Sequence, residues 1–170
     1  VRVGSDTIVN LGGYTVKFNA SHDATRYRGF HVGHSAEDGT TVSHIIIEKG
    51  KIDGNNRVDF GIETTYATDV TIRNMEIYNL SNVAPSSPNG VGIAISNLSY
   101  RVLIDGVYIH DGASDGINTY DAHFVTIRNA RIANFRRHGV AFADISPYRS
   151  SHCTLENSYI SDTTQSGIDI

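Results

Sequence analysis

One short pattern returns about six times along the chain, and this repeat restricts the fold more than any other feature of the sequence. Each copy contains a triplet with apolar ends, an apolar residue five positions after it, and a glycine that opens a second alternating segment. The triplets are residues 9–11, 45–47, 70–72, 102–104, 125–127 and 153–155, and the glycines are Gly29, Gly61, Gly92, Gly116, Gly139 and Gly167. Alternation of apolar and polar residues indicates strands with one buried face.

The repeat predicts a coil. The unit from Gly116 to Gly139 spans 23 residues, and so short a unit cannot bury its apolar face alone, so the units must stack. Equivalent strands then pair in parallel, about 4.8 Å apart. We therefore predict an all-β fold, a right-handed parallel β-helix of about six coils, in a single domain over residues 1–170. Because the pattern reaches both ends without a polar cap, we expect a segment of a longer β-helix.

Two further columns follow from stacking. The second residue after each triplet is Asn74, Asn129 or Asn157 in three coils and Gly13 or Gly106 in two others. This position therefore needs a tolerant backbone and suggests an asparagine ladder. An outward position alternates in charge from coil to coil: Glu48, Arg73, Asp105, Arg128 and Glu156. Alternating charges in a stacked column pair with their neighbours, so we interpret this column as a structural face.

Composition excludes several kinds of partner. The formal net charge is −4 and the 14 lysines and arginines are scattered, whereas nucleic-acid binding needs a concentrated basic surface. No membrane partner is expected, because the sequence contains no long apolar run and no signal peptide. Cys153 stands alone where other coils place valine or isoleucine, which predicts a buried apolar residue and no disulfide.

Four segments interrupt the repeat: residues 19–28, 33–43, 79–90 and 143–152. Two precede the strand that begins at the glycine and two follow it. They are therefore expected to form walls on both sides of that strand, with a groove between them along the coil axis.

The floor of this groove contains the candidate catalytic residues. Asp115 and His138 both precede a glycine on adjacent coils, which places them about 5 Å apart, and Asp59 lies two coils from Asp115, about 10 Å away. Arg137 adjoins His138, and Glu63 lies two residues after a glycine. We predict Asp115, His138, Asp59, Glu63 and Arg137 as catalytic.

Two reactions suit these residues. Paired carboxylates at such spacings serve glycoside hydrolysis. β-Elimination from a uronic acid would instead use Arg137, His138 or Tyr120 as acid and base, with a cation to neutralise the substrate carboxylate. The alternative to both is that Asp59 and Asp115 only cap turns before a glycine.

Substrate binding is assigned to residues in or beside the same groove. Asn118 shares the register of Glu63, and Tyr120, Tyr66 and Tyr148 are candidates to stack on sugar rings. Arg149 follows Tyr148 in the last of the long segments. We predict these five as substrate-binding residues.

No metal site or cofactor is predicted, with calcium as the one alternative. Residues 53–56 form an oxygen-rich turn, but this turn lacks the twelve-residue spacing and the closing glutamate of a calcium loop, which favours a tight turn. The eight histidines are dispersed, so zinc is not indicated either.

Three phrases carry a family resemblance: V-T-I-R-N at 70–74 and 125–129, S-D-G-I-N-T at 114–119, and R-H-G-V-A-F at 137–142. Together with the repeat over the whole chain, they resemble the pectate-lyase-like superfamily of right-handed parallel β-helices. Polygalacturonases in that superfamily have an adjacent pair of aspartates, which is absent here, although Arg137-His138-Gly139 resembles their G-H-G. Mannuronan epimerases have D-P-H where this chain has Asn118-Thr119-Tyr120. The remaining resemblance is to phage tailspike and appendage depolymerases, which implies a parallel homotrimer.

The expected function is therefore that of an extracellular carbohydrate-active β-helix, on a virion tail or otherwise outside the cell, that binds and cleaves a host or environmental surface polysaccharide. Its expected partner is a polysaccharide or cell-surface glycan, with homotrimer assembly if the chain is a tailspike. A noncatalytic glycan-binding adhesin or spacer and a secreted polysaccharide lyase are the alternatives. The residues do not choose between hydrolysis and β-elimination.

Overall fold

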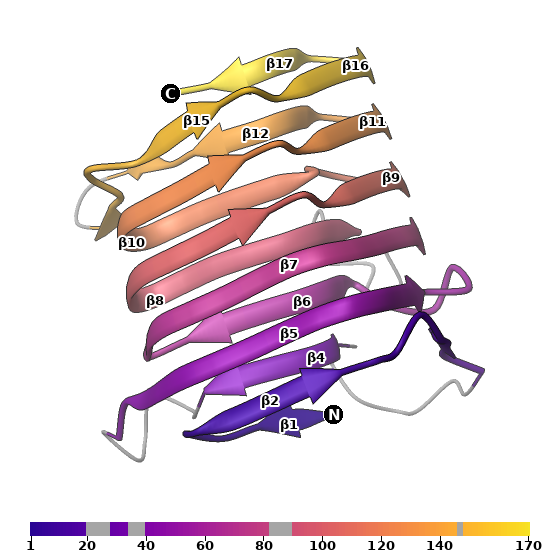
Figure 1. Cartoon of the computed structure of the whole chain (residues 1–170). Coiled ribbons are helices and arrows are strands. Elements are labelled where there is room, and N and C mark those ends of the chain that lie inside the picture. The colour runs from indigo at the N-terminus through magenta and orange to yellow at the C-terminus, as the bar shows by residue number, and fades with distance from the viewer. Residues whose placement is uncertain (20–27, 34–39, 82–89, 146–147) are drawn as a thin grey trace.

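Three ladders of parallel strands wind around one apolar interior in the computed structural model of the chain (Figure 1). The structure describes residues 1–19, 28–33, 40–81, 90–145 and 148–170, without the side chains of residues 144–148. Strand follows strand along the axis from the N-terminus at one end to the C-terminus at the other.

The ladders are named here by the sequence feature that defines each. The glycine ladder contains β1 (Arg2–Val3), β4 (Arg28–Gly33), β6 (Phe60–Thr65), the first parts of β8 (Val91–Asp105) and β10 (Ile117–Arg128), β12 (His138–Phe142) and β17 (Ser166–Asp169). The triplet ladder contains β2 (Thr7–Asn10), the first parts of β5 (Val42–Asp53) and β7 (Ala67–Leu80), the second parts of β8 and β10, and β15 (Thr154–Glu156). The isoleucine ladder contains β3 (Thr15–Lys17), the second parts of β5 and β7, β9 (Tyr108–Gly112), β11 (Arg131–Phe135) and β16 (Tyr159–Thr163). A separate antiparallel hairpin joins β13 (Asp144–Ile145) to β14 (Tyr148–Arg149).

Every strand pair in the three ladders is parallel, which confirms the predicted all-β parallel β-helix. The interior consists of stacked β-branched side chains, which suit a pleated and buried surface. The largest fully buried ones include Ile45, Ile47, Ile52, Ile62, Ile72, Ile77, Ile93, Ile104, Ile109 and Ile117.

The prediction of residues 9–11 as the first triplet is wrong, because the strand position equivalent to the other triplets is residues 7–9. The register pairs Val9, not Leu11, with Ile47, and Val16 still pairs with Ile52. The reason is a longer first coil: Gly12 and Gly13 have φ of 58° and 84° and turn the chain after the strand. Leu11 packs beside the core from that turn instead of pairing within the strand.

The corner between the triplet and isoleucine ladders has the tolerant backbone that the sequence predicts. All five predicted residues have positive φ: Gly13, Asn74, Gly106, Asn129 and Asn157. Lys49 holds the same position in the second coil and also has positive φ, of 57°. Asparagine and glycine adopt this left-handed conformation more readily than other residues. Of the three asparagines, only Asn129 and Asn157 lie on adjacent coils, because Gly106 separates Asn74 from Asn129. Asn129 Nδ2 donates to Asp105 Oδ1 at 2.8 Å, so the predicted asparagine ladder is not continuous in the described residues.

Two neighbouring pairs in the column of alternating charges form ion pairs between adjacent coils. Arg73 Nη2 lies 2.6 Å from Glu48 Oε2, and Arg128 Nη2 lies 2.8 Å from Asp105 Oδ2. The hydrogen bond from Arg73 is the main cause that lowers the pKa of Glu48, and that from Arg128 lowers the pKa of Asp105. This column is thus a structural feature of the outer surface.

Acid should therefore destabilise the fold. In the unfolded chain these carboxyls titrate near pH 4, and their pKa values are lower when folded, so the unfolded state binds more protons as the pH falls. We expect the urea midpoint of unfolding to drop as the pH is lowered from about 5 to about 3. The Arg73→Met/Arg128→Met variant should lose part of this dependence. A variant with the same pH dependence as the wild type would contradict the assignment.

Candidate functional site

A column of glycines aligns the residues of the candidate site. At Gly29, Gly61, Gly92, Gly116 and Gly139, an added Cβ would lie closer than 3.0 Å to the carbonyl oxygen of the glycine one coil further on. Real Cβ atoms essentially never approach so closely, so only glycine lets the chain bend here into the glycine ladder. The residues just before and after each glycine consequently stack in register.

The register is the one expected from the sequence. Glu63, Ala94, Asn118, Ala141 and Asp169 follow one another in a single column on the outer face. Polar residues and alanines therefore alternate from coil to coil along this column.

Asp115 is the centre of a polar cluster near this column. Its Oδ1 accepts the backbone N–H of His138 at 3.2 Å, and its Oδ2 accepts Asn118 Nδ2 at 3.0 Å. Arg137 Nη1 lies 3.4 Å from the same Oδ2. The Asp115 side chain is 1% exposed, whereas that of Arg137 is 36% exposed. Four predicted site residues are thus brought together, with the aspartate beneath and the cation at the surface.

His138 has a second acidic neighbour that the sequence reasoning did not select. Its Nε2 lies 3.6 Å from Asp169 Oδ2, and the Asp169 side chain is 57% exposed. Within the described residues, the buried Nδ1 of His138 has no hydrogen-bond partner. The signal for Asp169 was available, because it occupies the position of Asn118 two coils later.

Glu63 and Asp59 lie apart from this cluster. Glu63 forms an ion pair with Arg28 on the preceding coil, and Ala94 separates it from Asn118, which is two coil spacings or about 10 Å. Asp59 is fully buried, and its carbonyl accepts the backbone N–H groups of Gly90 and Val91. The five predicted catalytic residues therefore divide into one group around Asp115 and two separate carboxylates.

The predicted aromatic residues are less concentrated. Tyr120 lies half-buried on the glycine ladder opposite Ser96. Tyr66 is half-buried in the turn after β6, with φ of 51°. Arg149 is exposed in the hairpin strand β14, and the side chain of Tyr148 lies outside the description. Most of the predicted groove walls, residues 20–27, 34–39, 82–89 and 146–147, also lie outside the described residues.

The side chain of Asp53 stabilises the turn at residues 53–56 by accepting hydrogen bonds. Asp53 Oδ1 accepts the backbone N–H of Asn55 at 2.9 Å and Asn79 Nδ2 at 3.0 Å, as a tight turn requires. The described part of the chain contains no group of three histidine, cysteine, aspartate or glutamate side chains that could hold a metal ion. The same described residues contain no apolar helix of a length that could span a membrane.

Comparison with known proteins adds the family. The sequence model of the family described as right-handed β-helix region matches residues 80–170, which is 91 of the 170 residues. No curated protein matches the chain. The family match covers the coils that carry Asp115, Asn118, Arg137, His138 and Asp169. From this match and the three parallel ladders, the chain belongs to the right-handed β-helix family.

Proposed function

We propose that this chain is an extracellular carbohydrate-active β-helix that binds and cleaves a surface polysaccharide, in the manner of a phage tailspike or appendage depolymerase. The β-helix family includes polysaccharide lyases and hydrolases, which supports the substrate class. The same proposal places the chain outside the cell or on a virion tail. It also expects a homotrimer, with three times the 18.5 kDa mass of one chain in solution.

The observation that carries the proposal is the exposed edge of the Asp115 cluster. There, Arg137 and Asn118 contact Asp115, and the His138–Asp169 pair extends the cluster to the next coil. A histidine beside a carboxylate can accept or donate a proton, because the carboxylate orients the imidazole and stabilises its charged form. A guanidinium next to it can neutralise a sugar carboxylate. Acid, base and cation are thus present within one small surface.

Asp115 takes a positioning role in this proposal. Both of its carboxylate oxygens are engaged by protein donors, and its side chain is 1% exposed. A buried carboxylate that accepts several hydrogen bonds holds its donors in a fixed geometry. Asp115 therefore orients Arg137 and Asn118, and Asp169 orients the imidazole of His138, while His138 and Arg137 contact the substrate.

This arrangement favours β-elimination over hydrolysis. Arg137 binds the uronate carboxylate, which makes the hydrogen on the adjacent ring carbon more acidic, and His138 takes that proton. The bond to the neighbouring sugar oxygen then breaks, a carbon–carbon double bond forms in the ring, and the leaving oxygen gains a proton. Hydrolysis needs two carboxylates on opposite sides of the bond, and in the described cluster only Asp169 is an exposed carboxylate.

The burial of Asp115 also favours a second candidate function, glycan binding without cleavage. In that case the cluster serves only as a hydrogen-bonding surface of an adhesin or spacer. The two functions make different predictions for the same mixture of protein and polymer.

The test is incubation of the purified chain with a panel of acidic and neutral surface polysaccharides. Elimination yields both new reducing ends and unsaturated products that absorb in the ultraviolet, whereas hydrolysis yields reducing ends alone. We expect both signals with an acidic polymer. Binding without either signal would favour the adhesin. If the chain neither binds nor cleaves any polymer of the panel, both functions are contradicted.

A further inference from the structure

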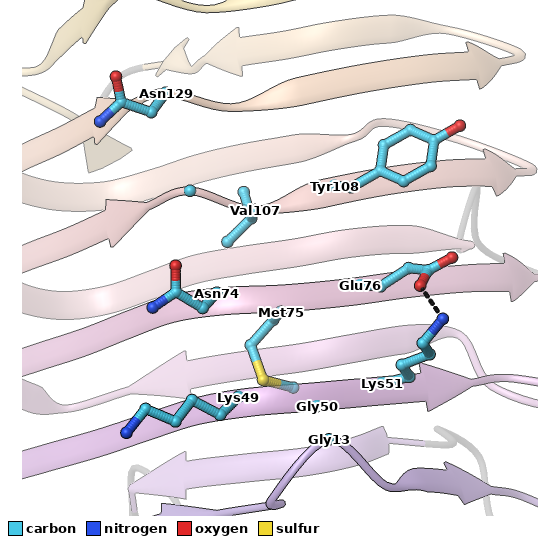
Figure 2. Close-up of a pocket in the computed structure, with 11 residues that line it drawn as sticks. Gly13, Lys49, Gly50, Lys51, Asn74, Met75, Glu76, Val107, Tyr108 and Asn129 are labelled. Carbon is cyan, nitrogen blue, oxygen red and sulfur yellow. Dashed lines mark ion pairs between the residues drawn. The ribbon is translucent and has the colours of Figure 1, made fainter.

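A second groove lies on another side of the coil, at the corner between the triplet and isoleucine ladders (Figure 2). Its volume is about 470 Å³. It crosses the coils from Gly13 to Asn129, which at about 4.8 Å per coil is roughly 19 Å along the axis. The residues that the glycine-ladder site uses are not among those that line it.

The groove has an apolar floor between two polar rims. Gly50, Met75 and Val107 form the floor and are buried. In Figure 2, Lys49, Asn74 and Asn129 lie along one rim, and Lys51, Glu76 and Tyr108 along the other. Gly106 lies between Asn74 and Asn129, and an added Cβ there would come within 3.0 Å of Asn74 Oδ1. The absence of a side chain at Gly106 therefore keeps this rim open.

Polar groups at the rims have unused hydrogen-bonding capacity. Within the described residues, neither the side-chain amide of Asn74 nor the hydroxyl of Tyr108 makes a hydrogen bond, and both line the groove. The Tyr108 ring is held from two directions, since His110 stacks on it at 4.3 Å and the guanidinium of Arg131 lies 4.8 Å from its centre. The position of its hydroxyl is thus largely fixed before a ligand arrives.

The rims carry an excess of positive charge. Lys51 pairs with Glu76 at 2.6 Å, which neutralises both. Lys49 lies 3.5 Å from Glu48, but Glu48 is already paired with Arg73 at 2.6 Å. Arg131 has no ion pair in the described part of the chain. Two cationic charges therefore remain, that of Lys49 in the groove lining and that of Arg131 outside the lining but against the Tyr108 ring, on a chain whose formal net charge is −4.

These features identify the class of ligand. A linear chain with carboxylates would complement the two cations, and its hydroxyl groups would bond to the Asn74 amide and the Tyr108 hydroxyl. The carbon–hydrogen faces of sugar rings suit the small apolar floor. An extended peptide fits less well, because it would bind by adding a strand, and the backbone groups of both ladders are already paired.

We propose that this groove binds a linear acidic polysaccharide along the coil axis, independently of the glycine-ladder site. The groove anchors the polymer by its charge and does not cleave it. A chain that both anchors and cleaves the same polymer would then use two different faces of one coil.

The test is a binding titration with β-1,4-glucuronan, alginate and hyaluronan as acidic probes. Cello-oligosaccharides serve as the uncharged match for glucuronan. The titrations are run with the wild type and with His138→Gln, so that cleavage does not change the probe. We expect at least one acidic probe to bind at least about tenfold more tightly than its uncharged match, and to shift the side-chain amide resonances of Asn74 and Asn129.

Two variants locate the binding. Lys49→Gln/Arg131→Gln should weaken it by about tenfold or more, because charged contacts are lost. Gly106→Asn should weaken it similarly by filling the rim, and its φ of 63° is one that asparagine adopts at the same position in neighbouring coils. Arg57→Gln removes an exposed cation outside the groove and should leave binding unchanged.

Three results would overturn the proposal: no binding of any acidic probe, equal binding of the neutral match, or full binding by the groove variants. None of them would bear on the glycine-ladder site, which is read out by cleavage. Conversely, loss of cleavage in His138→Gln with retained binding would leave this groove as proposed.

Discussion

The His138→Gln variant should lose polysaccharide cleavage by about a hundredfold or more, since a positioned acid–base group contributes roughly 10²–10⁴ to a rate. Glutamine keeps the backbone N–H that Asp115 accepts at 3.2 Å, so the cluster should retain its arrangement. Only the imidazole and its contact with Asp169 are removed. The measurement is the initial rate of reducing-end formation at saturating polymer, which reports kcat, with binding measured separately.

Controls separate chemistry from folding in this experiment. His44→Gln removes an exposed histidine at another corner and should leave the rate unchanged. Asp169→Asn should slow cleavage with little effect on binding, because Asp169 acts through the imidazole. Asp115→Asn should change both binding and rate, because it holds Arg137 and Asn118. If His138→Gln cleaves at the wild-type rate, the proposed site is wrong.

Most of the coil can be predicted from the sequence, because stacking gives equivalent residues the same environment in every coil. Val70, Val102 and Val125 occupy one buried position, so their spacing alone predicts their pairing. The same logic places Asp115 and His138 on adjacent coils. It fails in the first coil, where the Gly12–Gly13 turn adds residues that no other coil has, and the register of Leu11 was therefore predicted wrongly.

Side-chain partners were harder to predict than positions. A column states which residues are neighbours, but not which of several hydrogen bonds each makes. Glu63 was predicted as a catalytic residue of the groove, yet it forms an ion pair with Arg28 on the preceding coil. Asn129 bonds to Asp105 and not to another asparagine. The choice depends on side-chain length and on local backbone direction, which the repeat pattern does not contain.

The second groove was hidden for a related reason. Asn74, Gly106 and Asn129 appear in the sequence as turn residues, and they are turn residues, with φ between 52° and 63°. Their binding capacity comes from what surrounds the turn: a missing side chain at Gly106 and the cation of Arg131 beside Tyr108. Such a surface becomes visible only when neighbouring coils are placed together.

Replacing Gly116 by alanine should destabilise the fold by about 3 kcal/mol, the upper part of the range for overpacked sites. The new Cβ would lie 2.5 Å from the carbonyl oxygen of Gly139 and closer still to Ile132 Cγ2. Both neighbours belong to rigid parts of the coil, since one is backbone and the other is fully buried. Because the backbone at Gly116 does not have a positive φ, the loss would arise from packing alone. Urea denaturation followed by circular dichroism measures it.

Gly167→Ala is the matched control for this prediction. Gly167 occupies the same position of the repeat, but its added Cβ would meet only Ile160 Cγ2, at an ordinary contact distance of 3.8 Å. Alanine should therefore be neutral there, or stabilise the fold by up to about 1 kcal/mol by restricting the unfolded chain. Equal unfolding free energies for the two variants would show that glycine is present in the column for a reason other than close contact. A large difference would establish that the bend into the glycine ladder, and with it the register of Asp115 and His138, depends on the missing side chain.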